Sequence, residues 1–199
     1  MTELLLFNTW STKDISVQDP GLKSCINIEQ VLTPKSHGRE AKFRFGKNKY
    51  HLVERLIGKL QIPGHKGKKH KYTSGHMTGK GTHATSIVLK AFKIVEQKTK
   101  ENPVKVFVKA VENAAPREEI TTIEYGGARY PQAVDCAPQR RIDFALRQMT
   151  QGAYGKSFNS RTTIEQALAD EIIKAYTLDS GSHAIARKLE VERQADSSR

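Results

Sequence analysis

The chain has 199 residues, of which 37% are hydrophobic and 27% are charged, a composition that fits one domain with a single apolar core. Its 33 lysines and arginines outnumber its 21 aspartates and glutamates, so the formal net charge is +12 and a polyanionic partner is indicated. No apolar run approaches the roughly 18 residues of a membrane helix, which argues against a membrane partner. The two cysteines are far apart in sequence, which argues against a disulfide framework and fits a cytosolic protein.

The positive charge is concentrated in one segment of the chain. Residues 35–80 contain 13 basic and 2 acidic side chains, a net charge of +11, whereas residues 1–34 have a net charge of −2. A basic run without compensating acids is typical of a surface that binds RNA phosphates, although a solvated charge run would have the same composition. The sequence therefore predicts an RNA-binding protein and not an enzyme.

Residues 1–48 are expected to form a partly extended, basic N-terminal arm. Short apolar stretches alternate with turn residues in its first part, where one short helix is expected at residues 24–32. The basic stretch that follows supplies six predicted RNA-binding side chains: Lys35, Arg39, Lys42, Arg44, Lys47 and Lys49. Phe43 and Phe45 alternate with these cations and are candidates either for stacking on RNA bases or for anchoring the arm to the core.

Residues 49–199 are expected to form a helical domain. Apolar residues recur at helical spacing in residues 52–60, and Pro63-Gly64 is expected to end this first helix. Residues 64–81 are mostly Gly, Lys, His and Thr, which predicts a loop that is flexible or ordered by RNA. Four lysines of this loop are candidate RNA contacts: Lys66, Lys68, Lys69 and Lys71.

The same loop contains residues that resemble other kinds of site. Four histidines lie in or next to it: His65, His70, His76 and His83. Their spacing is irregular and no cysteine accompanies them, so a zinc site is not expected. The stretch from Gly75 to Thr82 differs from a nucleotide-binding loop, because only three residues separate its first two glycines and no buried strand precedes it. No nucleophile–base pair is evident either, so we expect no catalytic residue, metal or cofactor.

The helices that follow are predicted from their caps and apolar stripes. Thr82 is expected to cap a second helix, and Asn102, followed by Pro103, a third. Phe107 and Val111 lie on the apolar stripe of this third helix. Three further helix starts are expected at Pro138, at the capping box Thr162-x-x-Glu165 and at Ser182.

The hydrophobic pattern changes its period between the third and fourth helices. Two β-prone runs flank Gly126-Gly127, which predicts a hairpin over residues 117–137. Pro131 requires a free edge on the return strand, so the hairpin is expected to protrude. The predicted fold class is mainly α: a bundle of five or six helices with one protruding β-hairpin and an extended basic N-terminal arm.

Arg140 and Arg141 lie in the first turn of the predicted fourth helix, where the helix dipole disfavours cations. An external anion would explain this placement, so both arginines are candidate phosphate contacts; the alternative is ordinary surface charge.

Three consecutive features of the sequence carry a resemblance to a known family. Residues 99–117 read TKENPVKVFVKAVENAAPR, the Gly126-Gly127 hairpin follows, and residues 138–147 read PQRRIDFALR. In the same order, these segments resemble the third helix, the β-ribbon and the Pro-x-Arg-Arg helix of the universal small-subunit ribosomal protein family seven.

Other motifs resemble the cytoplasmic eukaryotic members of the family. They are Leu6-Phe7 with Trp10-Ser11-Thr12, PKSHGR at residues 34–39, VERL at residues 53–56 and the ending LEVERQADSSR. Residues 70–81 depart from the family as an apparent insertion, and the Tyr-Gly-Gly-Ala hairpin tip is closer to bacterial members.

The resemblance implies a structural constituent of the small ribosomal subunit that binds the head (3′ major) domain of small-subunit ribosomal RNA and helps to nucleate head assembly. It implies neighbouring head proteins as partners, a cytoplasmic location on the ribosome and assembly in the nucleolus. The hairpin would lie near the tRNA exit site and the mRNA path, with four residues as candidate contacts: Gly126, Gly127, Arg129 and Tyr130. The residues alone leave open a free RNA-binding protein or an assembly chaperone.

Overall fold

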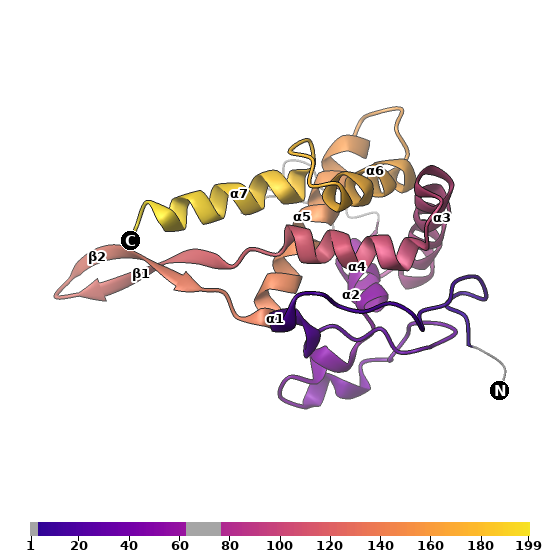
Figure 1. Cartoon of the computed structure of the whole chain (residues 1–199), viewed down its shortest axis with the longest axis horizontal. Coiled ribbons are helices and arrows are strands. Elements are labelled where there is room, and N and C mark those ends of the chain that lie inside the picture. The colour runs from indigo at the N-terminus through magenta and orange to yellow at the C-terminus, as the bar shows by residue number, and fades with distance from the viewer. Residues whose placement is uncertain (1–3, 63–76) are drawn as a thin grey trace.

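Helices make up most of the structure, a computed structural model that describes residues 4–62 and 77–199 (Figure 1). The α-helices are α1 (Pro20–Lys23), α2 (Leu52–Leu60), α3 (Gly81–Thr99), α4 (Pro103–Ala114), α5 (Pro138–Ser157), α6 (Ile164–Tyr176) and α7 (His183–Asp196). Two 3-10 helices, η1 (Arg39–Lys42) and η2 (Gly46–Lys49), precede α2, and strands β1 (Glu118–Tyr125) and β2 (Ala128–Asp135) follow α4. The predicted mainly α fold with one β-hairpin is confirmed.

The core of the helical bundle lies around α6. This helix packs against α3, α4 and α5, and its buried residues include three alanines, which let the neighbouring helices approach closely. Phe92 of α3 and Phe107 of α4 are completely buried, and their ring centroids lie 5.6 Å apart. The apolar stripe predicted for the third long helix therefore faces the core, where its burial removes apolar surface from water.

Most helix starts lie where the sequence predicts them. Asn102 caps α4, since its Oδ1 accepts a hydrogen bond of 3.0 Å from the Val104 N–H, and Ser182 caps α7. The prediction that Thr82 caps α3 is wrong. Lys80 occupies the cap position without a side-chain hydrogen bond, because a turn over residues 77–80 leads directly into the helix.

The capping box of α6 is also one residue away from its predicted place. The sequence contains two overlapping matches to the box, Thr162 with Glu165 and Thr163 with Gln166. The structure uses the second: the Thr163 hydroxyl accepts from the Gln166 N–H, and the Gln166 side chain accepts from the Thr163 N–H, each at 3.4 Å. A motif alone does not distinguish between two adjacent registers that both satisfy it.

The first part of the N-terminal arm is anchored in the bundle. Leu6 and Trp10 are buried, and the Trp10 indole N–H donates to the Glu96 carboxylate at 3.1 Å. The short helix predicted at residues 24–32 lies instead at α1. Asp19 starts it, because its carboxylate accepts from the Gly21 N–H at 2.8 Å and proline follows at the first helical position.

The hairpin projects from the helical bundle, with α7 running beside its base (Figure 1). Its strands are antiparallel and are joined by Gly126 and Gly127, whose φ angles of 58° and 81° are typical of a tight two-residue turn. At the base, the Arg117 backbone N–H donates to the Glu192 carboxylate of α7 at 3.0 Å. The bundle therefore holds the base of the hairpin and leaves its tip exposed.

Candidate nucleic-acid interface

The basic stretch of the arm forms an exposed double turn, η1 and η2. Four of its six predicted RNA-binding cations are exposed without a carboxylate partner in the described chain: Lys35, Arg39, Lys42 and Arg44. The other two are paired. The Lys47 Nζ lies 2.5 Å from an oxygen of Asp143, and the Lys49 Nζ lies 3.0 Å from an oxygen of Glu40. The arm thus divides into cations that hold it in place and cations that are available to an external anion.

Phe43 and Phe45 lie on the surface of this double turn. Their exposed fractions are 56% and 61%, so the alternative that they anchor the arm to the core is wrong. Cations lie over both rings instead. The Lys42 and Lys49 ammonium groups are 5.5 Å and 5.4 Å from the Phe43 centroid, and the Arg44 guanidinium is 5.0 Å from that of Phe45.

Close backbone packing fixes the shape of the double turn. Gly46 is buried against η1, and a Cβ atom at this position would lie 1.9 Å from the Glu40 carbonyl oxygen. No side chain other than hydrogen fits there. Phe45, directly before it, has a φ of 60°, in the left-handed region that non-glycine residues rarely adopt. The backbone that carries the two exposed phenylalanines therefore has a fixed conformation.

Asp143 of α5 connects the basic arm to the helical bundle. Its two oxygens bind the Lys47 Nζ at 2.5 Å and the Arg55 Nη2 at 3.3 Å, and Arg55 of α2 also donates to the Cys25 carbonyl at 3.0 Å. Burial alone raises the pKa of Asp143, but the hydrogen bond from Lys47 and the charges of Arg55, Lys47 and Lys59 outweigh it, so its pKa lies below the ordinary value. The carboxylate is therefore charged when it holds the arm.

A buried histidine caps the helix that carries Arg55. His51 precedes α2, and its Nδ1 accepts a hydrogen bond of 3.2 Å from the Val53 N–H. Burial lowers the pKa of His51 to about 4, so the imidazole is neutral at physiological pH and keeps this acceptor. The start of α2, and with it the position of Arg55, is thereby fixed.

Replacing Asp143 by asparagine is expected to weaken RNA binding although it raises the formal net charge from +12 to +13. Charge alone would strengthen binding to a polyanion. Loss of the carboxylate, however, loosens Lys47 and leaves Arg55 buried with a weaker partner, which costs about 1–3 kcal/mol of folding stability. Binding then has to order the arm, so we expect affinity to fall roughly tenfold, or about 1.4 kcal/mol. Filter binding and thermal melting measure the two effects.

Asp170→Asn is the matched control, because it makes the same charge change away from the arm. Asp170 of α6 pairs with Lys98, and both side chains are about half exposed, at 43% and 53%. We expect this variant to bind RNA as well as the unmodified chain, or slightly better. Equal or stronger binding by Asp143→Asn would show that Asp143 does not position the arm.

Arg140 and Arg141 each have a carboxylate partner within the protein. The Arg140 Nε lies 2.5 Å from a Glu119 oxygen, while Arg141 is buried and donates to the Pro116 carbonyl at 2.9 Å and to Asp19 at 2.7 Å. Their place in the first turn of α5 therefore does not require an external anion. The Arg140 side chain is 62% exposed and stays a predicted phosphate contact, whereas the contacts of Arg141 give it a structural role.

The remaining predicted contacts lie apart from the arm. Gly126 and Gly127 are exposed at the hairpin tip, where Arg129 pairs with Glu124 at 3.6 Å and Tyr130 is 59% exposed. The hairpin projects away from the bundle, so its tip is not part of the same surface (Figure 1). Four predicted loop contacts lie outside the described residues: Lys66, Lys68, Lys69 and Lys71.

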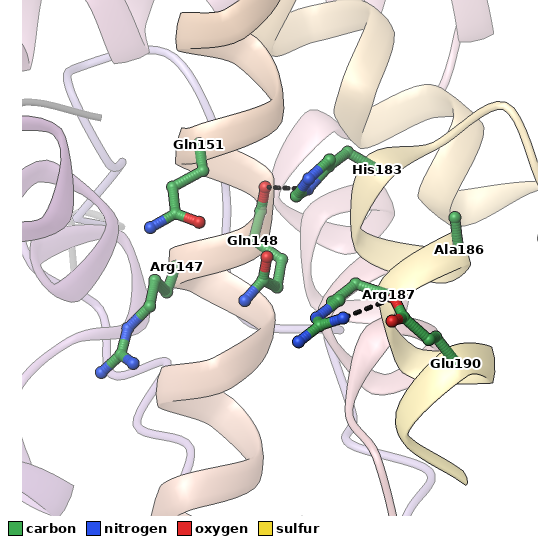
Figure 2. A pocket seen from close by; sticks show the side chains of 7 residues that line it. All are labelled: Arg147, Gln148, Gln151, His183, Ala186, Arg187 and Glu190. Atoms are coloured by element: carbon green, nitrogen blue, oxygen red, sulfur yellow. Dashed lines mark hydrogen bonds and ion pairs between the residues drawn. The ribbon is translucent and has the colours of Figure 1, made fainter. Parts of the chain in front are cut away.

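A groove of about 520 Å³ between α5 and α7 contains arginines that were not predicted as site residues. Figure 2 shows Arg147 of α5 and Arg187 of α7 on its two sides, with Gln148 between them. Arg187 pairs with Glu190 at 2.5 Å, and Arg147 is exposed. These residues are 40 positions apart in sequence, so no local pattern indicates that the two helices bring them together.

Over residues 4–62 and 77–199, no group of three or more His, Cys, Asp or Glu side chains is arranged to hold a metal ion. His65, His70 and His76 lie outside this part of the chain. The helices there are also too short or too polar to cross a membrane.

Comparison with known proteins identifies the family. The family model described as ribosomal protein S7p/S5e matches residues 26–199. A small ribosomal subunit protein uS7 from Nanoarchaeum equitans is 56% identical over 197 residues, which cover 99% of this chain and 100% of the relative. The uS7 protein of Archaeoglobus fulgidus is 45% identical, over 99% of this chain and 96% of the relative. The chain therefore belongs to the S7p/S5e family of ribosomal proteins, a family of structural proteins and not of enzymes.

Proposed function

We propose that this chain is a structural constituent of the small ribosomal subunit that binds the head domain of small-subunit ribosomal RNA and helps to nucleate its assembly. The observation that carries the proposal is the set of exposed cations in residues 35–44 of the arm that have no carboxylate partner in the described residues. Phosphates of RNA are the anions that such a surface binds in a basic protein. The names of the archaeal relatives support the same assignment.

The proposed RNA contacts are the exposed arm cations together with Arg140 and the loop lysines. Lys47 and Lys49 belong to the same surface, although each already has an intramolecular partner. Arg141 is buried and bound to Asp19, so we do not retain it as an RNA contact.

We propose a separate role for the hairpin, near the tRNA exit site and the mRNA path. Two observations support this role. The hairpin projects from the bundle, and residues 117–137 have a net charge of −2. The hairpin's acidic side chains that form ion pairs do so with arginines of this chain, Glu118 with Arg199, Glu119 with Arg140 and Glu124 with Arg129. It therefore adds little electrostatic affinity for ribosomal RNA. Contacts with neighbouring head proteins, mRNA and exit-site tRNA belong to this proposal.

The sequence motifs predict that this family member is of the cytoplasmic eukaryotic type and assembles in the nucleolus, and both statements stay predictions. Both relatives named above are archaeal.

The test compares the tagged full chain with a variant in which a short turn replaces residues 122–130. Because the proposed RNA contacts, which are the arm cations, Arg140 and the loop lysines, lie outside the deleted residues, we expect both chains to co-sediment with small subunits at high salt. We expect the deletion to alter start-site or frame fidelity in translating extracts, since it removes only the projecting part of the hairpin. Sucrose gradients and reporter translation measure the two results.

The outcomes separate the parts of the proposal. A full chain that leaves the small subunit at high salt would indicate a free RNA-binding protein or an assembly chaperone. If the deletion variant is folded but not incorporated, the hairpin is an assembly anchor. Normal incorporation with normal fidelity would show that the hairpin has no role in translation.

A further inference from the structure

Two aromatic rings of the arm are exposed in a chain that has an apolar core available to bury them. Phe43 and Phe45 lie two positions apart, and more than half of each side chain is accessible to solvent. Exposed large aromatic side chains that lie together are informative, because burying one is normally favourable by about 2 kcal/mol. Their exposure therefore points to a partner that covers them.

The turn that carries these rings is held at several points before any partner binds. The Ser36 N–H and hydroxyl both donate to Glu54 of α2 at 2.7 Å, and the Asn27 amide donates to the Lys49 carbonyl at 2.7 Å. The ion pair between Lys47 and Asp143 fixes the turn to α5. A surface that is already ordered loses little conformational entropy on binding.

The chemistry around the rings fits a nucleic acid and not a protein. Lys42, Lys49 and Arg44 lie 5.0–5.5 Å from the ring centroids, and residues 38–43, which include Phe43, line an open cleft of about 590 Å³. Lysine is depleted in the cores of protein–protein interfaces, whereas alternation of cations with aromatic rings is typical of surfaces that bind single-stranded nucleic acid.

We propose that Phe43 and Phe45 form a platform on which unpaired RNA bases stack, while the adjacent cations bind the phosphates between those bases. This proposal rests on the proposed function, that the chain binds RNA. In a continuous RNA duplex the faces of the bases are covered by their neighbours, so a stacking platform selects loops, bulges or single strands. The arm therefore recognises RNA by its unpaired bases as well as by its charge.

The test uses the full chain with Phe43 and Phe45 both changed to leucine. Leucine keeps the apolar surface but has no π face, and no charge changes. The probes are a single-stranded RNA of about twelve nucleotides, within the usual range of site sizes, and a duplex of the same sequence. Affinity for the single strand is expected to fall at least tenfold, whereas affinity for the duplex and the salt dependence stay as in the unmodified chain.

Two further variants make the result specific. Changing both residues to tryptophan is expected to retain affinity, and the fluorescence of the new indoles is expected to be quenched by the single strand and not by the duplex. The natural Trp10 is buried and provides a constant signal from the folded core. Phe158→Leu is the matched control, because Phe158 is 42% exposed at the opposite end of α5 from Asp143. It is expected to leave both affinities unchanged.

Each other result has a distinct meaning. Unchanged affinity of the leucine variant for the single strand overturns the platform, and so does an equal loss on both probes, which indicates a distorted arm. If the unmodified chain binds neither RNA in a salt-dependent way, the proposed function itself fails. If it binds both equally tightly and the leucine variant does the same, only the platform fails.

Discussion

Replacing Lys35, Arg39, Lys42 and Arg44 together by alanine is expected to weaken RNA binding and to flatten its dependence on salt. Each phosphate that a cation neutralises contributes about 0.7 to 0.9 to the slope of log affinity against log salt, so four cations contribute about 3. Between about 50 and 200 mM salt, the unmodified chain should then lose roughly fifty-fold more affinity than the variant. Titration of ribosomal RNA fragments at several salt concentrations measures both slopes.

The control changes the same amount of charge on another face. Lys90, Lys93, Lys98 and Lys105 are exposed on α3 and α4, and three of them already pair with a carboxylate. Their replacement by alanine also lowers the formal net charge from +12 to +8. We expect only a small change of slope, because these lysines are not on the proposed surface. Equal effects of the two variants would show that total charge, and not the arm, determines binding.

Replacing Phe107 by alanine is expected to cost roughly 3–5 kcal/mol of folding stability. The side chain is completely buried and its ring lies against that of Phe92, so its removal loses apolar burial and leaves a cavity. This is a large share of the stability of an ordinary domain, about 5–15 kcal/mol in total. Urea denaturation of the free protein measures the loss.

Phe43→Ala is the matched control, because it removes the same atoms from an exposed position. We expect it to change stability by less than about 1 kcal/mol, as for most surface substitutions, while it weakens binding to single-stranded RNA. Together, the two variants distinguish a residue of the folded core from a residue of the surface that contacts RNA. If Phe107→Ala melts normally and loses RNA affinity, the apolar stripe of α4 faces the RNA and not the core.

The order of elements, the apolar stripes and most turns were predictable from the sequence, because they depend on interactions between residues close together in the chain. Asn102 caps α4 by binding the N–H two residues later, and Gly126-Gly127 adopts the positive φ angles that the hairpin turn needs. Local patterns did not fix the start of a helix where two neighbouring positions satisfy the same capping motif about equally well. The capping box of α6 shifted by one residue for this reason, and α1 formed at the Asp19 cap instead of at residues 24–32.

The role of each charged or aromatic side chain depends on contacts between distant parts of the chain. Lys47 and Asp143 are 96 residues apart, and Asp19 and Arg141 are 122 residues apart, so the sequence does not show which cations already have a partner. The exposure of Phe43 was likewise undetermined, because the same alternation of cations and aromatics fits an anchored or an exposed arm. A basic sequence indicates that phosphate can be bound. Packing determines which cations remain free to bind it, because ion pairs form between whichever residues the fold brings within about 4 Å.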